Sequence, residues 1–427
     1  LSYLLIIAGT VLIFGHLAAK GMLKRLLITG FILFTLASLV CGFAPTFPVL
    51  ITARFLQGLG GSMLIACAPI ICLQFLPREI LGFAFGLIAA ASSVGFAMGP
   101  ALGGVLTHLL SWHWIFWINV PIGIAAIIYI AKITPSAKKG EQTPTTKFDI
   151  KSAVSLFIAL VSGCLLLERA PHMGIAHPLI LVCAGLCIAS LVYFSFHARN
   201  TPNPLLNIRV FKLHPVAFSV IAYLIIQTVL SGIIYILPFY FTNQFNVDSL
   251  ICGLLMLIHP VITALLGTFF GKWSDTHGRR VFCVLSCLLL VVVSGIFAFL
   301  NPALGLLPCI ATLIIAGISV AMGLGPAATQ IVDQMPETER ETGSTISVAI
   351  IYLGAVIGTA LYAAVFTCLT ATGGDAHSFA DLSSSLFFTG FQGTMIVGLL
   401  LSALGALLSF KVKNKRTTQK REHTENS

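Results

Sequence analysis

Charged side chains are scarce in this chain, and their scarcity limits what the chain can be. Asp, Glu, Lys and Arg make up 9% of its 427 residues, whereas a soluble domain carries roughly 25%. A soluble globular domain of useful size is therefore excluded. In place of charge, apolar runs long enough to cross about 30 Å of hydrocarbon recur from end to end. Because backbone groups in lipid must be satisfied within the segment, each run predicts a helix.

The runs predict an all-α polytopic membrane protein with about thirteen spans and the lipid bilayer as its first partner. The expected spans cover residues 1–19, 25–43, 48–75, 81–107, 114–132, 150–167, 177–196, 216–241, 250–271, 281–299, 304–332, 343–370 and 389–410.

Acidic residues are rarer still, and none lies near the middle of an expected span. The chain has 14 Asp and Glu residues; Glu168 and Asp333 lie at span ends, and the others lie in loops or in the tail. Without an acid pair or an HExxH motif inside the spans, we expect no enzymatic activity. No nucleotide-binding loop is present, so coupling to ATP would need another protein.

The 11 cysteines include no metal-type CxxC pair and fall almost wholly within the expected spans. This placement is typical of small apolar packing residues. We therefore expect no disulfide framework, no bound metal and no other cofactor.

The basic residues behind the net charge of +10 are concentrated in alternate loops. The charge therefore indicates membrane topology and not a nucleic-acid partner. Every second loop is basic, whereas the loops between them hold little Lys or Arg beyond Arg169. By the positive-inside rule the basic loops are cytoplasmic. The chain is therefore predicted to be a multi-pass protein of the cell (inner, cytoplasmic) membrane, with Leu1 outside and a cytoplasmic C-terminus.

A guanidinium is expected inside the third span. Arg54 lies between Thr46 and Phe75 and is followed by Gln57 and Gly58. Arg is not deprotonated in proteins, and at mid-membrane it costs at least about 2.5 kcal/mol. A functional role would need a partner for this charge. The structural alternative is bonding to carbonyl groups within a tight bundle.

Two short basic links resemble each other, which suggests two related halves. One runs from Gly15 to Arg25, and the other from Gly271 to Arg280. Asp275 lies four residues before Arg279, so the two could pair or reach another helix end and form a gate. The alternative is that such loops only set topology. The proposed gating residues are Gly15, Lys20, Lys24, Arg25, Gly271, Asp275, Gly278, Arg279 and Arg280.

Small residues recur on one helix face at Gly95, Gly99 and Gly103, and Pro100 adds a bend. The stretch ends at Gly104, and its periodicity alone fits ordinary close packing of helices.

Polar residues form a stripe along another expected span. Tyr223, Gln227, Ser231 and Tyr235 recur every four residues and so share one helix face. The stripe could line a substrate cavity or form interhelical hydrogen bonds, and both interpretations stay open. Two further candidates for a cavity are His259 and Gln330.

Four motifs carry a resemblance to a known family. GKWSDTHGRR (271–280) is similar to the G-x-x-x-D-x-x-G-R-R loop signature of the major facilitator superfamily, and RFLQG (54–58) to its R-x-x-Q-G motif. GFAMGPALGG (95–104) resembles its antiporter motif, G-x-x-x-G-P-x-x-G-G, and this resemblance implies a bending hinge at Gly95, Gly99, Pro100, Gly103 and Gly104. WHWIFWINVPIG (112–123) resembles the W-R-W-I-F-x-x-N-x-P-x-G run of the fourteen-helix drug:proton antiporters of the EmrB/QacA type.

The resemblance covers essentially the whole chain and implies the major facilitator fold, with two helical-bundle halves and two extra helices between them. It divides the chain into an N-terminal half (1–133), a cytoplasmic loop (134–149), two inserted helices with a linker (150–214), a C-terminal half (215–410) and a basic cytoplasmic tail (411–427).

Two departures accompany the resemblance. The first expected span matches the family's second helix, so we expect the family's first helix, which usually carries a membrane-embedded Asp, to be missing and the chain to be a fragment. In the first basic link, Ala19 stands where the family has Asp, and Met22 where it has Gly. The second link keeps both, as Asp275 and Gly278.

By resemblance, the expected function is secondary active transport: proton-coupled export (drug:H+ antiport) of small amphipathic or toxic compounds by alternating access, driven by the proton gradient. Arg54, Gln57 and Gly58 would take part in proton coupling, with the acid in the absent helix. Family members in double-membrane bacteria can work with a periplasmic adaptor and an outer-membrane channel. The alternatives are an uptake permease of the same fold and a non-transporting fragment.

Overall fold

The computed structural model describes residues 2–133, 149–174, 177–201, 204–370 and 383–412, and all the regular structure in these ranges is helical. The α-helices are α1 (Ser2–Leu17), α2 (Leu23–Gly42), α3 (Phe47–Phe75), α4 (Leu81–Leu109), α5 (Trp114–Trp117), α6 (Asn119–Ile133), α7 (Ile150–Met173), α8 (Pro178–Asn200), α9 (His214–Phe245), α10 (Ser249–His277), α11 (Arg279–Phe299), α12 (Leu307–Gln334), α13 (Arg340–Thr370) and α14 (Ser384–Lys411). Short helical turns connect several of them: η1 (Ala18–Met22), η2 (Arg78–Ile80), η3 (Ile208–Lys212), η4 (Pro302–Leu304) and η5 (Glu337–Glu339).

Each expected span overlaps a helix, and the span 114–132 covers two, α5 and α6, but the count of thirteen membrane crossings is not confirmed. Ten helices among the described residues are long and apolar enough to cross a membrane. The apolar helices Trp114–Ile130 and Ile150–Gly163 are shorter, and one long stretch, Gly9–Gly42, combines part of α1 with α2. The all-helical membrane architecture is therefore confirmed, and the number of crossings stays a prediction.

A sharp turn divides the stretch Gly9–Gly42 at the first basic link. Gly21 has φ of 89° there, and Gly278 has φ of 94° in the second link. Both values lie in the left-handed region, which glycine adopts without steric cost. Gly21 therefore makes the turn of the first link, although Met22 occupies the position where the family has its glycine.

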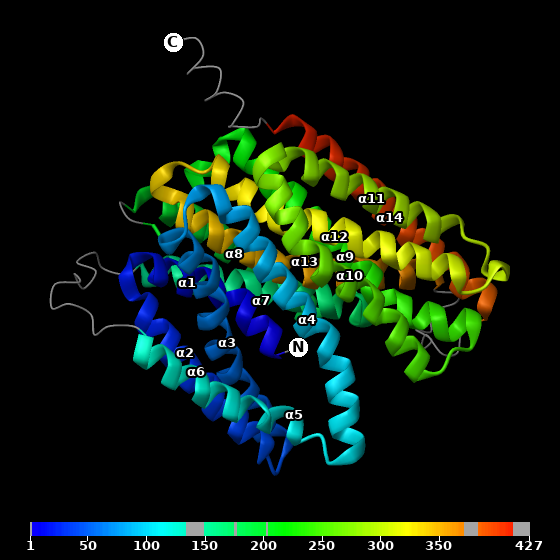
Figure 1. Ribbon diagram of the computed structural model, residues 1–427, viewed down its shortest axis with the longest axis horizontal. Helices are drawn as coiled ribbons and strands as arrows, with labels where there is room; N and C mark the ends of the chain where they lie inside the picture. Colours follow the sequence, from blue (N-terminus) through cyan, green and yellow to red (C-terminus); the bar gives the residue numbers. More distant parts are fainter. Residues whose placement is uncertain (1, 134–148, 175–176, 202–203, 371–382, 413–427) are drawn as a thin grey trace, which may run out of the picture.

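The helices form two groups, which meet through a few long helices. In Figure 1, α1, α2, α3, α5 and α6 gather at the lower left, and α9–α14 lie toward the upper right. The long helix α4 leaves the first group to pack along α10 and α12, and α1 packs on α13. These crossings join the two halves of the chain.

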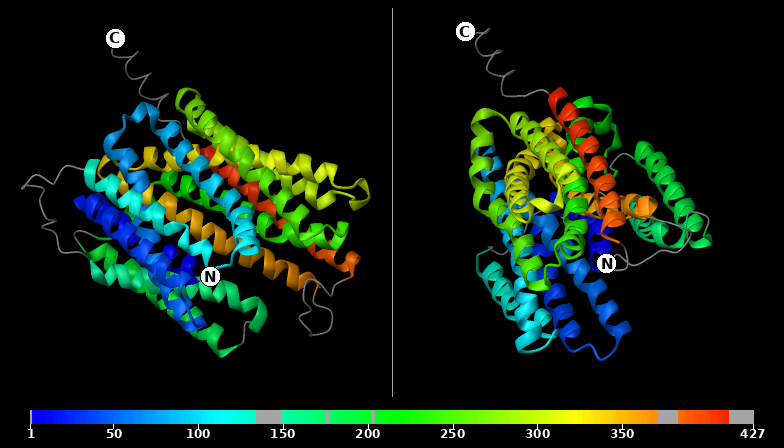
Figure 2. Two further views of the ribbon diagram at one scale, coloured as in Figure 1. Left: turned by 60° about the horizontal axis from the view of Figure 1, so that its bottom comes forward. Right: turned by 90° about the vertical axis from the view of Figure 1, so that its right-hand side faces the viewer.

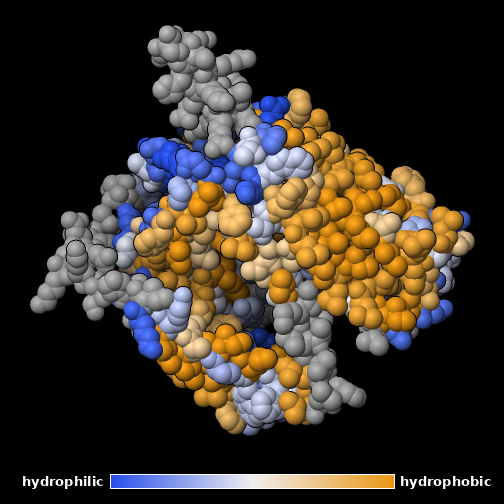
Figure 3. Space-filling view, viewed as in Figure 1, coloured by the Kyte–Doolittle hydropathy of each residue, from blue (hydrophilic) through white to orange (hydrophobic). Residues whose placement is uncertain are grey.

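One end of the molecule carries both basic links together with η2 and η5, and we call it the basic end. It forms the hydrophilic region at the upper left of the space-filling view, whereas apolar side chains cover much of the remaining surface (Figure 3). The same view shows that the surface is hollowed between the two groups of helices. The halves therefore touch at the basic end and are separated by a hollow elsewhere on this face.

Aromatic rings fill the core of the C-terminal half. The ring centroids of Tyr240 and Phe391 lie 4.1 Å apart in a stacked pair, and Phe297 meets both rings edge-on. Helix association in lipid depends on close packing because the lipid tails are as apolar as the side chains. This cluster therefore holds α9, α11 and α14 together.

The two inserted helices form a hairpin on the outside of the molecule. α7 packs against α1 and α13, whereas α8 packs mainly on α7. Viewed from the side, the hairpin projects from the rest of the molecule (Figure 2, right view). Only 17% of the central stretch of α8 is buried, the smallest share among the ten candidate spans. Most of α8 is therefore exposed on the outside of the helical bundle.

Candidate functional site

Glycine brings the two halves into backbone contact where α4 crosses α10 at the basic end. A Cβ atom built on Gly86 would lie 2.7 Å from the carbonyl oxygen of Gly267, and one on Gly271 would overlap the carbonyl oxygen of Gly82. Gly325 of α12 approaches the same place, since its Cβ would lie 3.0 Å from the backbone nitrogen of Gly86. Backbone atoms cannot move aside as a flexible side chain can. Only residues without a Cβ fit this three-helix contact, which we call the glycine contact.

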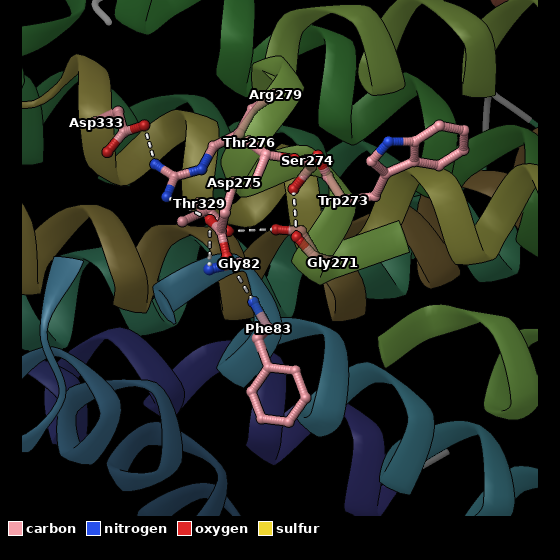
Figure 4. A network of polar contacts seen from close by, with 11 residues as sticks. Gly82, Phe83, Gly271, Trp273, Ser274, Asp275, Thr276, Arg279, Thr329 and Asp333 are labelled. Carbon is pink, nitrogen blue, oxygen red and sulfur yellow. Dashed lines mark hydrogen bonds and ion pairs between the residues drawn. The ribbon is translucent and has the colours of Figure 1, made fainter. Parts of the chain in front are cut away.

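Asp275 caps the start of α4 beside the glycine contact (Figure 4). Its Oδ1 accepts a hydrogen bond from the backbone N–H of Gly82, and its Oδ2 one from Phe83, both at 3.0 Å. The first turn of a helix has N–H groups without intrahelical partners, and the helix dipole favours a negative charge there. A buried carboxylate from the C-terminal half therefore satisfies two free donors in the N-terminal half.

Arg279 joins the same cluster from the start of α11. Its Nη2 donates to Asp275 Oδ1 at 3.0 Å, and its Nη1 pairs with Asp333 near the end of α12. The expected pair of Asp275 and Arg279 is thus present, and Asp275 also reaches another helix end. The ion pairs of Arg279 lie within the C-terminal half, and the hydrogen bonds that Asp275 accepts from Gly82 and Phe83 cross to the N-terminal half. Separation of the halves at the basic end must therefore break these two hydrogen bonds.

Removing the charge of Asp275 is expected to loosen the start of α4. In the variant Asp275→Asn, one amide oxygen replaces two carboxylate oxygens, and a charge-assisted hydrogen bond is worth about 1.5–3 kcal/mol. Amide hydrogen exchange of peptides that cover the start of α4 should therefore quicken about tenfold or more. Asp248→Asn is the matched control, because Asp248 caps only its own helix by accepting from Ile251 N at 2.8 Å. Unchanged exchange at α4 in Asp275→Asn would contradict the capping role.

Two further contacts join the halves at the basic end, and sequence analysis did not single them out. Gln74 Nε2 donates to Glu341 Oε1 at 2.9 Å, and Arg78 Nη2 to Glu337 Oε1 at 3.0 Å. The side chains of Arg78 and Glu337 are 60% and 75% exposed, so their ion pair contributes little stability. The sequence did carry a signal for these contacts. The acidic residues in the stretch 337–341 and the basic Arg78 lie in loops that the charge pattern places on the same side of the membrane.

The first basic link contributes a close helix contact in place of a charge cluster. A Cβ on Gly15 would overlap the side chain of Thr345 on α13. Lys20 and Lys24 are half-buried, and Arg25 is exposed. The first link has Ala19 at the position that Asp275 occupies in the second link. The first link therefore contacts the other half by close packing, and the second by charged hydrogen bonds.

Arg280, the last of the proposed gating residues, contacts the final helix of the bundle. Its guanidinium lies over the ring of Phe410, with Cζ 4.6 Å from the ring centroid. A cation over an aromatic face at this distance is attracted by the ring. Arg280 therefore ties the start of α11 to the end of α14, within the C-terminal half.

Arg54 has an amide and two rings around its charge. Its Nη1 donates to Gln57 Oε1 at 3.0 Å, and its Cζ lies 4.4 Å from the centroid of the Phe116 ring and 5.9 Å from that of Tyr3. Gln57 is buried and donates onward to Ser38 Oγ at 2.7 Å. Among the described residues, no carboxylate lies within ion-pair distance of Arg54. The guanidinium is therefore oriented by Gln57 of its own helix and by rings from α1 and α5, and no described carboxylate neutralises it.

Glycines next to Arg54 let three helices approach one another. A Cβ on Gly58 would lie 3.0 Å from the carbonyl oxygen of Tyr3 and 3.1 Å from Cβ of Ile6, so α3 touches α1 there. A Cβ on Gly60 would lie 2.6 Å from the backbone nitrogen of Phe34 on α2. The R-x-x-Q-G stretch thus combines an uncompensated charge with tight helix packing.

The proposed hinge residues all lie within α4. The space around Gly95 is open, with no atom within 4 Å of a Cβ built there. Gly99, Pro100, Gly103 and Gly104 continue the helix toward Leu109, and their surroundings fall outside the described residues.

The polar stripe of α9 is divided by burial. Tyr223 and Gln227 are buried, and Cβ of Gln227 lies against Gly354 of α13, whereas Ser231 and Tyr235 are half-buried. Gln227 Oε1 is buried without a hydrogen-bond partner in the described part of the chain. The part of the stripe formed by Tyr223 and Gln227 therefore packs between helices, and among the described residues the Gln227 Oε1 atom has no hydrogen-bond donor.

The two remaining cavity candidates lie on α10 and α12. Gln330 is buried in α12, and His259 is half-buried before Pro260 in α10. The carbonyl oxygen of His259 accepts a hydrogen bond from Thr263 Oγ1 at 2.9 Å. The structure does not bring either residue into the cluster around Asp275 or to Arg54.

Comparison with known proteins shows the family. The sequence model of the Major Facilitator Superfamily matches residues 1–359. MdtD of Serratia proteamaculans, named as a multidrug resistance protein, is 27% identical over 426 residues, which cover 98% of this chain and 86% of MdtD. The riboflavin transporter RibZ of Clostridioides difficile is 28% identical over 370 residues, which cover 86% of this chain and 78% of RibZ.

A solved structure supports the same fold. The human organic anion transporter MFSD10 superposes with a TM-score of 0.69 at 15% identity, over 95% of this chain and 82% of MFSD10. At this identity the likeness concerns the fold alone. The family match extends over most of the sequence, and the helices cross as a two-half membrane bundle. The chain therefore belongs to the Major Facilitator Superfamily.

Proposed function

We propose that this transporter exports small amphipathic compounds in exchange for protons, by alternating access. The glycine contact and the Asp275 cluster carry the proposal, because they join the two halves at the basic end and would have to part during alternating access. The similarity to MdtD supports multidrug export as the direction and substrate class.

The orientation follows from the charge pattern. Under the positive-inside rule the basic end faces the cytoplasm, and we therefore assign the structure to a state closed to the cytoplasm, with its hollow toward the outside. A full cycle then needs a second state, in which the hydrogen bonds that Asp275 accepts from Gly82 and Phe83 are broken.

Arg54 suits the coupling role because its charge is held in place and no carboxylate in the described part of the chain neutralises it. A titrating carboxylate that approached it would be favoured in its charged form, and loss of that contact would favour proton uptake. Arg54, Gln57 and Gly58 are the residues that we assign to this step, with the proton gradient as the energy source.

Transport by reconstituted protein tests the proposal. Vesicles that carry an imposed pH gradient and a fluorescent amphipathic dye should move dye against its gradient, and a protonophore should abolish the movement. Dye efflux in the antiport direction with simultaneous proton influx supports export. Movement in the same direction as protons would favour an uptake permease, and no movement in either direction would favour a non-transporting chain.

Riboflavin is the second substrate to test, because RibZ is among the similar proteins. Flavin fluorescence inside the same vesicles reports its uptake or efflux directly. Transport of riboflavin without transport of chemically unrelated dyes would replace the multidrug proposal with a selective one.

A further inference from the structure

A groove opens between the two inserted helices, away from the residues discussed so far. Its volume is about 480 Å³, within the range of about 300–1,000 Å³ that is typical of ligand sites. It begins at Ile150 and Lys151 of α7 and reaches Tyr193 of α8, so it lies near the basic end of the hairpin.

The two helices are pinned on either side of this groove. At the basic end, the His197 ring bonds to Asp149 at 3.1 Å, and Asp149 also accepts from Ser152 N. Burial opposes the charge of Asp149, but these hydrogen bonds outweigh it and lower its pKa, so the carboxylate stays ionised. Farther along, a Cβ on Gly163 would lie 3.3 Å from Cys187 Sγ, so the helices touch there as well.

Small side chains leave the space between the two pins open. Ser155, Ala189 and Ser190 line its floor, and the apolar side chains of Val154 and Ile158 stand beside it, 51% and 37% exposed. The groove opens toward the surroundings, because several of its lining side chains, among them Ile150, Val154 and Tyr193, are exposed. In a bilayer these surroundings are lipid tails.

A free positive charge lies at the end of the groove. Lys151 is exposed and has no ion-pair or hydrogen-bond partner among the described residues, while Asp149 is already engaged by His197. Tyr193 lies at the rim, 47% exposed, with its ring stacked on His197. A cation beside a phenol at the membrane surface suits a phosphate group, since such lysines attract anionic lipid headgroups.

We propose that this groove binds one anionic phospholipid, with an acyl chain between α7 and α8 and its phosphate at Lys151. A helix from a second copy is about 10 Å across, which is too wide to enter a gap between two helices that already touch. A single acyl chain fits such a gap. Lipid binding goes beyond the transport function, and its test needs no transport.

Native mass spectrometry of the purified protein tests the proposal with phosphatidylglycerol as the probe. We expect one tightly retained phosphatidylglycerol per chain and weaker retention of zwitterionic phosphatidylcholine. Lys151→Gln should lower phosphatidylglycerol retention about fivefold and remove the headgroup preference. Ser190→Phe, which fills the groove, should lower retention of both lipids, and Ala189→Leu is a milder variant if the first does not fold.

Lys132→Gln is the matched control, because Lys132 is also exposed at the end of a membrane helix but lies outside the groove. Retention in this variant should equal that of the unaltered protein. If Lys151→Gln and Ser190→Phe both retain as much phosphatidylglycerol as the unaltered protein, the proposal is overturned. Displacement of the lipid by inorganic phosphate alone, or a dimer that Ser190→Phe dissociates, would also overturn it by assigning a different occupant.

Discussion

Transport by the variant Arg54→Gln is expected to fall by more than about a hundredfold while the protein stays folded. The charge of Arg54 is not neutralised by any described carboxylate, so it can act on a proton-carrying group that approaches it. A charge 4 Å away at an effective dielectric of 20 is worth about 4 kcal/mol, which is more than two decades in rate. Dye efflux from vesicles under a fixed pH gradient measures this loss.

The melting temperature of Arg54→Gln distinguishes a functional charge from a structural one. Loss of the contacts with Phe116 and Gln57 costs about 2 kcal/mol, but removal of a charge from the membrane interior returns a similar amount. Stability should therefore change little. Arg54→Lys keeps the charge but not the planar group that stacks on Phe116, so it should restore transport only in part. A large drop in melting temperature together with lost transport would assign Arg54 a packing role instead.

The second large effect is expected for Gly271→Ala. Its new methyl group would overlap the carbonyl oxygen of Gly82, and overpacking of this kind costs about 1–3 kcal/mol. The cost falls on the closed arrangement of the basic end, so its population relative to the open one should drop about tenfold to a hundredfold. Faster hydrogen exchange at the start of α4 and slower dye efflux would both report the shift.

Gly253→Ala provides the control on the same helix. A Cβ at Gly253 meets no atom within 4 Å, so the substitution adds the same helix propensity without the collision. Efflux and exchange should match those of the unaltered protein. If Gly271→Ala and Gly253→Ala behave alike, the glycine contact does not control closure.

Hydrophobic run length predicted where the helices lie, because each must satisfy its backbone within lipid. Spacing predicted the pair of Asp275 and Arg279, which is local to one link. The spacing could not predict that Asp275 also bonds to the start of α4. That Asp275 caps α4 depends on how α4 crosses α10, and this crossing depends on glycines at positions 82, 86, 267 and 271 that repeat at i, i+4 on both helices.

The surroundings of Arg54 show the same limit. Gln57 lies on the next turn of its own helix, so its hydrogen bond follows from sequence. Phe116 and Tyr3 come from other helices, and only the fold brings their rings to the guanidinium. For the stripe of α9, periodicity predicted a shared face, but which neighbour covers Tyr223 and which part stays open depends on packing.

The capping of α4 by Asp275 also sets an order of events during biosynthesis. Asp275 follows Gly82 by 193 residues, which a ribosome adds in roughly 10–40 s at about 5–20 residues per second. Throughout that delay the first turn of α4 waits at the membrane surface with its amide donors hydrated. The N-terminal helices must therefore hold their shape without their later partner, and closure between the halves is a late step in maturation.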